Sequence, residues 1–259
     1  MSVLEATGLV KTYGGQRALD GFTLHVAAGE IVGLVGHNGA GKTTFAEVVS
    51  GLVRPETGQV LVRGINALAR PQAARRLVSS CPQETALYPA ATVAEHLRLF
   101  GSLAGLRGAG LRRAADDIAE RMDLASVANK PTGLLSGGQR KRVQAATALV
   151  AEKPLLLLDE PTVGADPATR SRLLAVVADR AAAGAAVVYT THYLPELAEL
   201  GASVAVAASG RVIARGTRHE LSLQEVSALL GAAGTPDDDA RDDGSREAEQ
   251  EERHDADAA

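Results

Sequence analysis

The segment Gly36-His37-Asn38-Gly39-Ala40-Gly41-Lys42-Thr43 constrains the fold of this 259-residue chain more than any other feature. It matches G-x-x-x-x-G-K-[ST], a glycine-rich turn that joins a strand to a helix. The apolar run Ile31–Val35 before it predicts the strand, and a helical pattern begins at Thr43-Thr44. Because both flanks agree with the motif, the chain is predicted to contain an α/β unit built around this turn.

The chemistry of such a turn is phosphate binding. Its glycines let backbone N–H groups turn inward around an anion, and the helix start adds its positive dipole end. Lys42 is expected to reach the β- and γ-phosphates of a nucleotide, and the Thr43 hydroxyl to ligate Mg²⁺. The expected nucleotide contacts in this segment are Gly36, His37, Asn38, Gly39, Ala40, Gly41, Lys42, Thr43 and Thr44.

A pair of acids supports the same chemistry. Four leucines, Leu155–Leu158, run directly into Asp159 and Glu160, which is the pattern of a buried strand with two carboxylates at its end. Asp159 can hold the Mg²⁺ shell, and Glu160 can polarise an attacking water. The two motifs together predict a P-loop ATPase.

A third segment indicates which family of P-loop ATPases. Leu135-Ser136-Gly137-Gly138-Gln139, followed by Arg140-Lys141-Arg142 and an alanine-rich helix, resembles the signature motif of ABC ATPases. Ser136 and the backbone N–H groups of the two glycines form another anion site at a helix start. It lies too far along the chain to complete its own loop at Gly36–Thr43. The resemblance therefore implies an ATP-induced homodimer in which Ser136, Gly137, Gly138 and Gln139 face the partner's ATP.

The resemblance extends from residue 3 to about residue 220 and implies further roles. Tyr13 matches the aromatic residue that stacks on adenine, and Asp166 the aspartate that crosses the dimer interface. Gln83 resembles the glutamine that senses Mg²⁺ and the γ-phosphate, and His192 the switch histidine. Ala165 is smaller than the usual family residue, and Gly201-Ala202-Ser203 replaces a common Asp-Arg pair. The implied catalytic residues are Glu160, His192 and Gln83, and the implied metal ligands are Thr43, Gln83 and Asp159.

Alternating apolar runs and helical patterns predict an α/β fold, a P-loop ATPase core with a mostly parallel sheet. Leu4–Val10 and Arg17–Val26 follow one another without a helix, so they predict an antiparallel β flank. Thr92–Asn129 repeats large apolar residues at helical spacing, which predicts an inserted α-helical subdomain at about residues 92–143. Further strands are expected at Gln59–Arg63, Leu77–Ser80 and Ala185–Thr190, with a hairpin across Ser203–Arg215 and a last helix at Leu221–Leu230.

The charge is unevenly distributed. Residues 232–259 hold eleven Asp or Glu and three Arg, without apolar periodicity, so we expect an acidic disordered tail after an ATPase domain at residues 1–231. The formal net charge of −4 leaves the body only weakly basic, and no nucleic-acid partner is expected. The single cysteine, Cys81, cannot form an intrachain disulfide and is expected to be a small buried residue.

No apolar run reaches the roughly 18 residues that span a bilayer, and residues 1–7 show no secretory signal. The resemblance instead implies a transmembrane permease as partner and a position at the cytoplasmic face of the cell membrane. Residues 84–97 and 160–167 look most like ATPases of multidrug and antibiotic-efflux exporters with separate permeases. Leu87, Tyr88 and Pro89 are apolar residues in a loop, which suggests a permease contact there, and local packing explains them equally well.

The sequence leaves two alternatives to compare with this prediction. Asn129-Lys130-Pro131-Thr132 begins like the N-K-x-D motif of GTPases, but Thr132 replaces the aspartate and no strand precedes it. A non-transport ABC ATPase of the translation or DNA-repair type is the main alternative. Such relatives usually carry two ATPase domains or a long coiled-coil insertion, whereas this chain has one phosphate loop and one signature segment.

Overall fold

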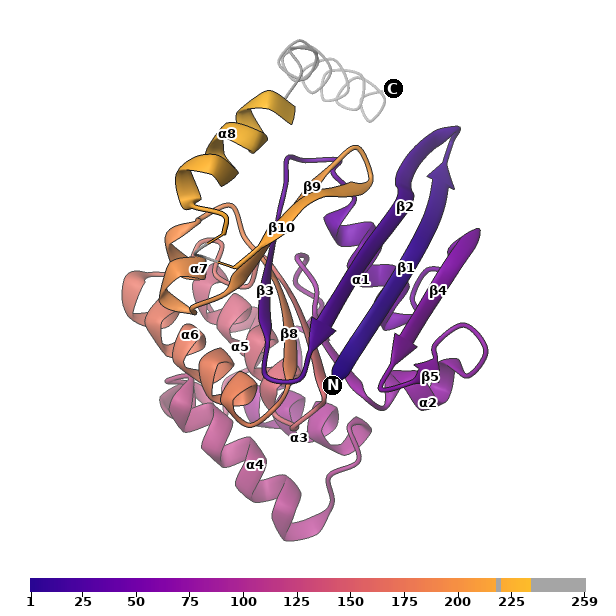
Figure 1. Ribbon diagram of the computed structural model, residues 1–259. Coiled ribbons are helices and arrows are strands. Elements are labelled where there is room, and N and C mark those ends of the chain that lie inside the picture. Colours follow the sequence, from indigo (N-terminus) through magenta and orange to yellow (C-terminus); the bar gives the residue numbers. More distant parts are fainter. Residues whose placement is uncertain (218–219, 234–259) are drawn as a thin grey trace, which may run out of the picture.

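The computed structural model describes residues 1–217 and 220–233. The predicted tail, apart from its first two residues, lies outside the described residues. The fold contains two sheets with helices around and between them (Figure 1). Among the described residues, no helix is long and apolar enough to cross a membrane.

The larger sheet has six strands in the order β10-β9-β3-β8-β7-β6. All neighbouring pairs are parallel except β9 and β10, which form the predicted hairpin. Every residue of β3, β7 and β8 is buried, as expected for a parallel sheet covered on both faces. The predicted mostly parallel core is therefore confirmed. The strands are β3 (Ile31–Val35), β6 (Val78–Cys81), β7 (Leu155–Asp159), β8 (Ala186–Thr190), β9 (Ser203–Ala208) and β10 (Arg211–Gly216).

The smaller sheet is antiparallel, in the order β2-β1-β4-β5, and confirms the predicted flank. Helix α1 (Lys42–Ser50) lies between the two sheets, where Phe45 stacks on Phe22 with ring centroids 4.7 Å apart. One apolar core joins this helix to both sheets and fixes where its N-terminus points. The strands are β1 (Ser2–Tyr13), β2 (Gln16–Ala27), β4 (Thr57–Val62) and β5 (Ile65–Asn66).

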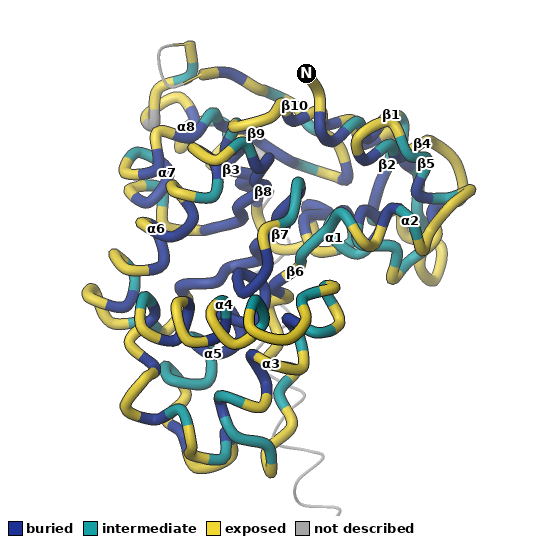
Figure 2. The backbone as a smooth tube through the Cα atoms, turned by 90° about the horizontal axis from the view of Figure 1, so that it is seen from below, coloured by how far each residue is buried: buried dark blue, intermediate teal, exposed yellow. Residues whose placement is uncertain are grey.

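A second apolar core joins the larger sheet to helices on its other side. Figure 2 shows β3, β7 and β8 at the buried centre of the molecule, with exposed helix surfaces around them. Helices α3 (Val93–Leu103) and α4 (Gly108–Arg121) lie together at one end, and α5 (Gly137–Leu149) connects them to the core. The remaining helices are α2 (Pro71–Arg75), α6 (Pro167–Ala182), α7 (Pro195–Glu199) and α8 (Leu223–Ala233).

These helices occupy the region predicted as an insertion, and its boundaries at residues 92 and 143 stay a prediction. Helix α3 begins at a capping box in which Thr92 and Glu95 satisfy each other's backbone N–H groups. Helix α5 continues without a break to Leu149. Cys81 is buried at the end of β6, and burial raises the pKa of its thiol to about 12, so it behaves as the predicted small buried residue.

Candidate nucleotide site

The loops after four parallel strands meet at one edge of the larger sheet. Because parallel strands end at the same edge, they gather residues that are distant in sequence. Segment Gly36–Thr43 follows β3, Gln83 follows β6, Glu160 follows β7 and His192 follows β8. The segments after β3, β6 and β7, together with Ala18 of β2, line a cavity of ≈ 230 Å³, and His192 is not among its lining residues. The cavity is lined by Ala18, Asn38, Gly39, Ala40, Gly41, Lys42, Thr43, Thr44, Gln83 and Glu160.

Two positions of the phosphate loop require glycine. A Cβ at Gly36 would lie 2.4 Å from the carbonyl oxygen of Ala207. Gly41 has φ +97°, and a Cβ there would lie 2.5 Å from the carbonyl oxygen of Ala18. Gly41 also precedes α1 without a side-chain cap, so the first backbone N–H groups of this helix have no capping side chain and suit a phosphate.

Lys42 spans the phosphate loop from within. Its ammonium group donates to the carbonyl oxygens of Gly36 at 2.6 Å and His37 at 3.0 Å. Desolvation lowers the pKa of Lys42, and the carboxylates of Glu160 and Asp159 act in the opposite direction. The side chain therefore lies inside the loop, where the charges of the two acids act on it, and its contact with a nucleotide stays a prediction.

Thr43 and Asp159 form the candidate metal pair. The Thr43 hydroxyl donates to Asp159 Oδ2 at 3.0 Å, and the Thr190 hydroxyl donates to Asp159 Oδ1 at 2.5 Å. Hydroxyl and carboxylate oxygens are hard donors of the kind that Mg²⁺ prefers. Mg²⁺ therefore fits this pair, which would hold it beside the phosphate loop.

Glu160 is the centre of the site. It is 6% exposed and has φ 47°, a left-handed conformation that is uncommon for residues other than glycine. Its Oε2 accepts from Gln83 Nε2 at 3.1 Å, and its Oε1 lies 2.5 Å from His192 Nε2. Its backbone N–H donates to the Thr190 hydroxyl at 2.9 Å. Strained backbone at a buried acid, held by two polar side chains, is typical of a functional position.

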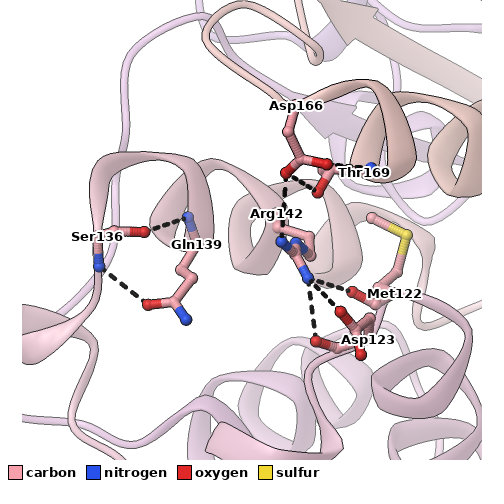
Figure 3. Close-up of polar contacts among 7 residues, drawn as sticks. All are labelled: Met122, Asp123, Ser136, Gln139, Arg142, Asp166 and Thr169. Atoms are coloured by element: carbon pink, nitrogen blue, oxygen red, sulfur yellow. Dashed lines mark hydrogen bonds and ion pairs between the residues drawn. The ribbon is translucent and has the colours of Figure 1, made fainter.

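The signature segment lies outside this cavity. Ser136 caps α5: its Oγ accepts from the Gln139 backbone N–H, and its own N–H donates to Gln139 Oε1 (Figure 3). Asp166 caps α6 with its carboxylate, which accepts from both the backbone N–H and the hydroxyl of Thr169. Hydrogen bonds from Thr169 and, less strongly, the charge of Arg142 lower the pKa of Asp166. None of the described cavity-lining residues belongs to the segments that carry these caps.

Arg142 connects the two capped helices, a role that the sequence analysis missed. From α5, its Nη1 donates to the Asp123 carboxylate at 3.0 Å and to the Asp123 carbonyl at 3.1 Å, while its Nη2 lies 3.8 Å from Asp166 (Figure 3). In the sequence, the only sign of this role is the basic run Arg140-Lys141-Arg142 after the signature segment. The chain order does not show which of its three residues turns toward Asp166.

Tyr13 lies at the β1–β2 turn and is 46% exposed. Its ring is contacted by Lys11, whose Nζ lies 5.1 Å from the centroid. Desolvation and then the charge of the Glu47 carboxylate raise the pKa of Tyr13. Tyr13 is not among the lining residues of the cavity, and its stacking role stays a prediction.

A mostly parallel sheet with a glycine-rich loop between β3 and α1, and acids at the end of β7, defines a P-loop ATPase. Residues 19–163 match the family model described as ABC transporter, so the chain belongs to the ABC transporter family. It is 39% identical over 237 residues to the "Daunorubicin resistance ATP-binding protein DrrA3" of Streptomyces coeruleorubidus, covering 90% of this chain and 75% of that protein.

Solved structures agree. The chain is similar to the ATP-binding subunit of an ABC transporter, with a TM-score of 0.82 and 31% identity over 88% of this chain and 99% of that one. It is also similar to a dimeric ATP-binding cassette in a post-hydrolysis state bound to ADP and Pi. That similarity has a TM-score of 0.76 and 26% identity, over 83% of this chain and 98% of that one.

Proposed function

We propose that this chain is the ATP-hydrolysing subunit of an exporter, which dimerises on ATP and powers a separate transmembrane permease. The observation that carries the proposal is the position of Glu160. This buried acid borders the cavity of the phosphate loop and is held between Gln83 and His192. A nucleotide-binding module without hydrolysis would not need these three side chains in contact.

Binding follows from the loop. The β- and γ-phosphates enter among the N–H groups of residues 36–44, and Lys42 exchanges its contacts with the carbonyls of Gly36 and His37 for phosphate oxygens. Thr43 and Asp159 would hold Mg²⁺, which would neutralise charge on the phosphates. In this proposal, Tyr13 stacks on the adenine and supplies an apolar surface.

Hydrolysis follows from Glu160. Its carboxylate orients a water and accepts its proton as the water oxygen bonds to the γ-phosphorus and the bond to the β-γ bridging oxygen breaks. His192 and Gln83 lie in contact with that carboxylate and are the groups that turn to the γ-phosphate and its Mg²⁺ when these are present. The reaction releases ADP and phosphate.

The second half of each site comes from a second copy. Ser136–Gln139 begins α5 outside the cavity, yet it presents backbone N–H groups and a hydroxyl to an anion. A head-to-tail dimer with two-fold symmetry places this segment against the partner's γ-phosphate and brings Asp166 to the same interface. The similar cassette bound to ADP and Pi is described as dimeric, which supports this arrangement.

Export is proposed from the relatives. The similar Streptomyces protein is named for daunorubicin resistance, so the transported compound is proposed to be a small organic molecule that the permease selects. The permease would bind at the loop after β6, where Tyr88 is 61% exposed, and would hold the subunit at the cytoplasmic face of the membrane. A non-transport ABC ATPase remains the alternative.

The test has two parts. Glu160→Gln should bind ATP with unchanged affinity and lose hydrolysis by about 100-fold or more, because the amide cannot accept the proton. The wild-type chain, expressed in its native cells with an affinity tag, should co-purify with a polytopic membrane protein. Co-purification with ribosomes or DNA would favour the alternative, and full hydrolysis by Glu160→Gln would refute the catalytic role.

A further inference from the structure

The loop between β6 and α3 carries Gln83, and its backbone is held by helix α5. Gln144, on α5, is 3% exposed and points into this loop. Its Nε2 donates to the carbonyl oxygens of Pro82 at 2.5 Å and Glu84 at 2.7 Å, and its Oε1 accepts from the Ala86 N–H at 2.9 Å. One buried amide thus satisfies three backbone groups within five residues.

Lys141 adds a fourth contact from the same face of α5, since it precedes Gln144 by three residues. Its ammonium group donates to the carbonyl oxygen of Gln83 itself. Hydrogen bonds of a buried amide are costly to leave unmade, because each unpaired group keeps its desolvation penalty. Residues 82, 83 and 84 therefore all have their carbonyl groups held by side chains of α5.

We propose that Gln144 is a positioning residue that fixes the Gln83 loop to the helix that begins at the signature segment. Helix α5 starts at Ser136 and passes Lys141 and Gln144 within three turns. A displacement of its N-terminus on meeting the partner's nucleotide is carried by Gln144 to the Gln83 loop. Gln83 in turn donates to Glu160, the proposed base.

The effect of Gln144 on catalysis rests on the proposed hydrolysis at Glu160. The fixing of the Gln83 loop by Gln144 does not depend on it. Gln144 touches none of the reacting groups; it acts through the backbone on either side of Gln83. The contacts link Ser136 of one site to Glu160 of the other site within a single chain. Hydrolysis at one site then depends on whether the signature segment of the same chain is engaged.

The first arm of the test uses the full chain without nucleotide. In Gln144→Met, which keeps the length and removes the amide, hydrogen exchange of the Ala86 amide should accelerate by about tenfold or more. Gln144→Glu should keep that amide protected, because a carboxylate oxygen still accepts from it, while losing both donors to the carbonyls. Unchanged exchange in Gln144→Met would overturn the inference.

The matched control is Thr147→Val. Thr147 is buried one turn further along α5, and its hydroxyl donates only to the Gln144 carbonyl in the same helix. Exchange at Ala86 and hydrolysis should both stay within about twofold of the wild type, since this change leaves the Gln83 loop untouched. Acceleration at Ala86 in this control equal to that in Gln144→Met would show a general softening of α5 and would overturn the inference.

The second arm measures ATP hydrolysis. Both Gln144 variants should lower kcat by about tenfold, with KM for ATP within about threefold, because the phosphate loop is unaltered and only the Gln83 loop is displaced. An unchanged kcat in a Gln144→Met variant with fast Ala86 exchange would overturn the link to catalysis. A wild-type chain that binds ATP without hydrolysing it would instead overturn the proposed function. If Gln144→Met does not fold, Gln144→Glu tests the loss of kcat.

Discussion

Gly41 is the residue at which local geometry most directly decides function. Its φ of +97° is left-handed, and a methyl group would meet the Ala18 carbonyl at 2.5 Å. Gly41→Ala should therefore destabilise the fold by about 1–3 kcal/mol and weaken ATP binding by about tenfold or more. Chemical denaturation and titration with a fluorescent ATP analogue measure the two effects.

Gly110→Ala provides the matched control for this prediction. Gly110 lies in α4, and no atom lies within 4 Å of an added Cβ. Since alanine favours helix more than glycine does, this variant should be more stable by about 0.5–1 kcal/mol and should bind ATP normally. If both variants behaved alike, the close approach at Gly41 would not be what the loop requires.

The elements that carry most site residues could be predicted from motifs. A strand, a glycine-rich turn and a helix in this order place Lys42 and Thr43 at the start of a helix. Asp159 and Glu160 follow for the same reason, since they end a buried strand. Gln144 and Arg142 could not be predicted. The partners of Gln144 lie 58 to 62 residues away in the sequence, and Asp123, the partner of Arg142, lies 19 residues away. These contacts therefore depend on how α5 packs, which periodicity does not show.

At the scale of elements, strands were more predictable than short helices. The hydrophobic runs of β3 and β7 match the prediction residue for residue, because a fully buried strand needs an unbroken apolar run. The five-residue helix α2 and the two-residue strand β5 were not predicted. Such short elements carry too few residues for periodicity, and their neighbours in the fold stabilise them.

The loop after β6 gives the prediction at this scale. Tyr88 is 61% exposed, and its backbone N–H donates to the buried ring of His96 at 2.9 Å, so its side chain is presented outward. Tyr88→Asp should abolish permease-dependent export. The unfolding free energy of the isolated subunit should stay within about 0.5 kcal/mol of the wild type, and its basal rate of ATP hydrolysis should be unchanged to the same extent in free-energy terms. Export in cells and hydrolysis by the purified chain are the measurements.

Leu87 is the contrasting position next to it. Leu87 is partly buried and packs against the apolar core. Of the predicted apolar loop residues, Leu87 therefore serves packing, whereas Tyr88 is exposed. Leu87→Asp should lower the unfolding free energy by about 1–3 kcal/mol, because a charge enters an apolar contact. A fall in the unfolding free energy of Tyr88→Asp equal to that of Leu87→Asp would show that this loop serves folding and not a permease.

At the scale of the whole molecule, the residues proposed to contact nucleotide lie in two separate places. One edge of the larger sheet carries the phosphate loop, the metal pair and Glu160, whereas Ser136 begins a helix that does not line that cavity. A single chain therefore carries one phosphate loop and, separate from it, the helix start at Ser136 that we propose as a second anion site. In the proposed dimer, these two meet between copies.

The most direct test is the mass of Glu160→Gln in solution with saturating Mg-ATP, measured by light scattering. Because this variant should retain ATP without hydrolysing it, we expect a dimer of about twice the 26.7 kDa chain mass. Adding Ser136→Arg should return the protein to the monomer while ATP remains bound, since the bulk falls at the proposed interface. A Glu160→Gln chain that binds ATP and stays a monomer would contradict the account.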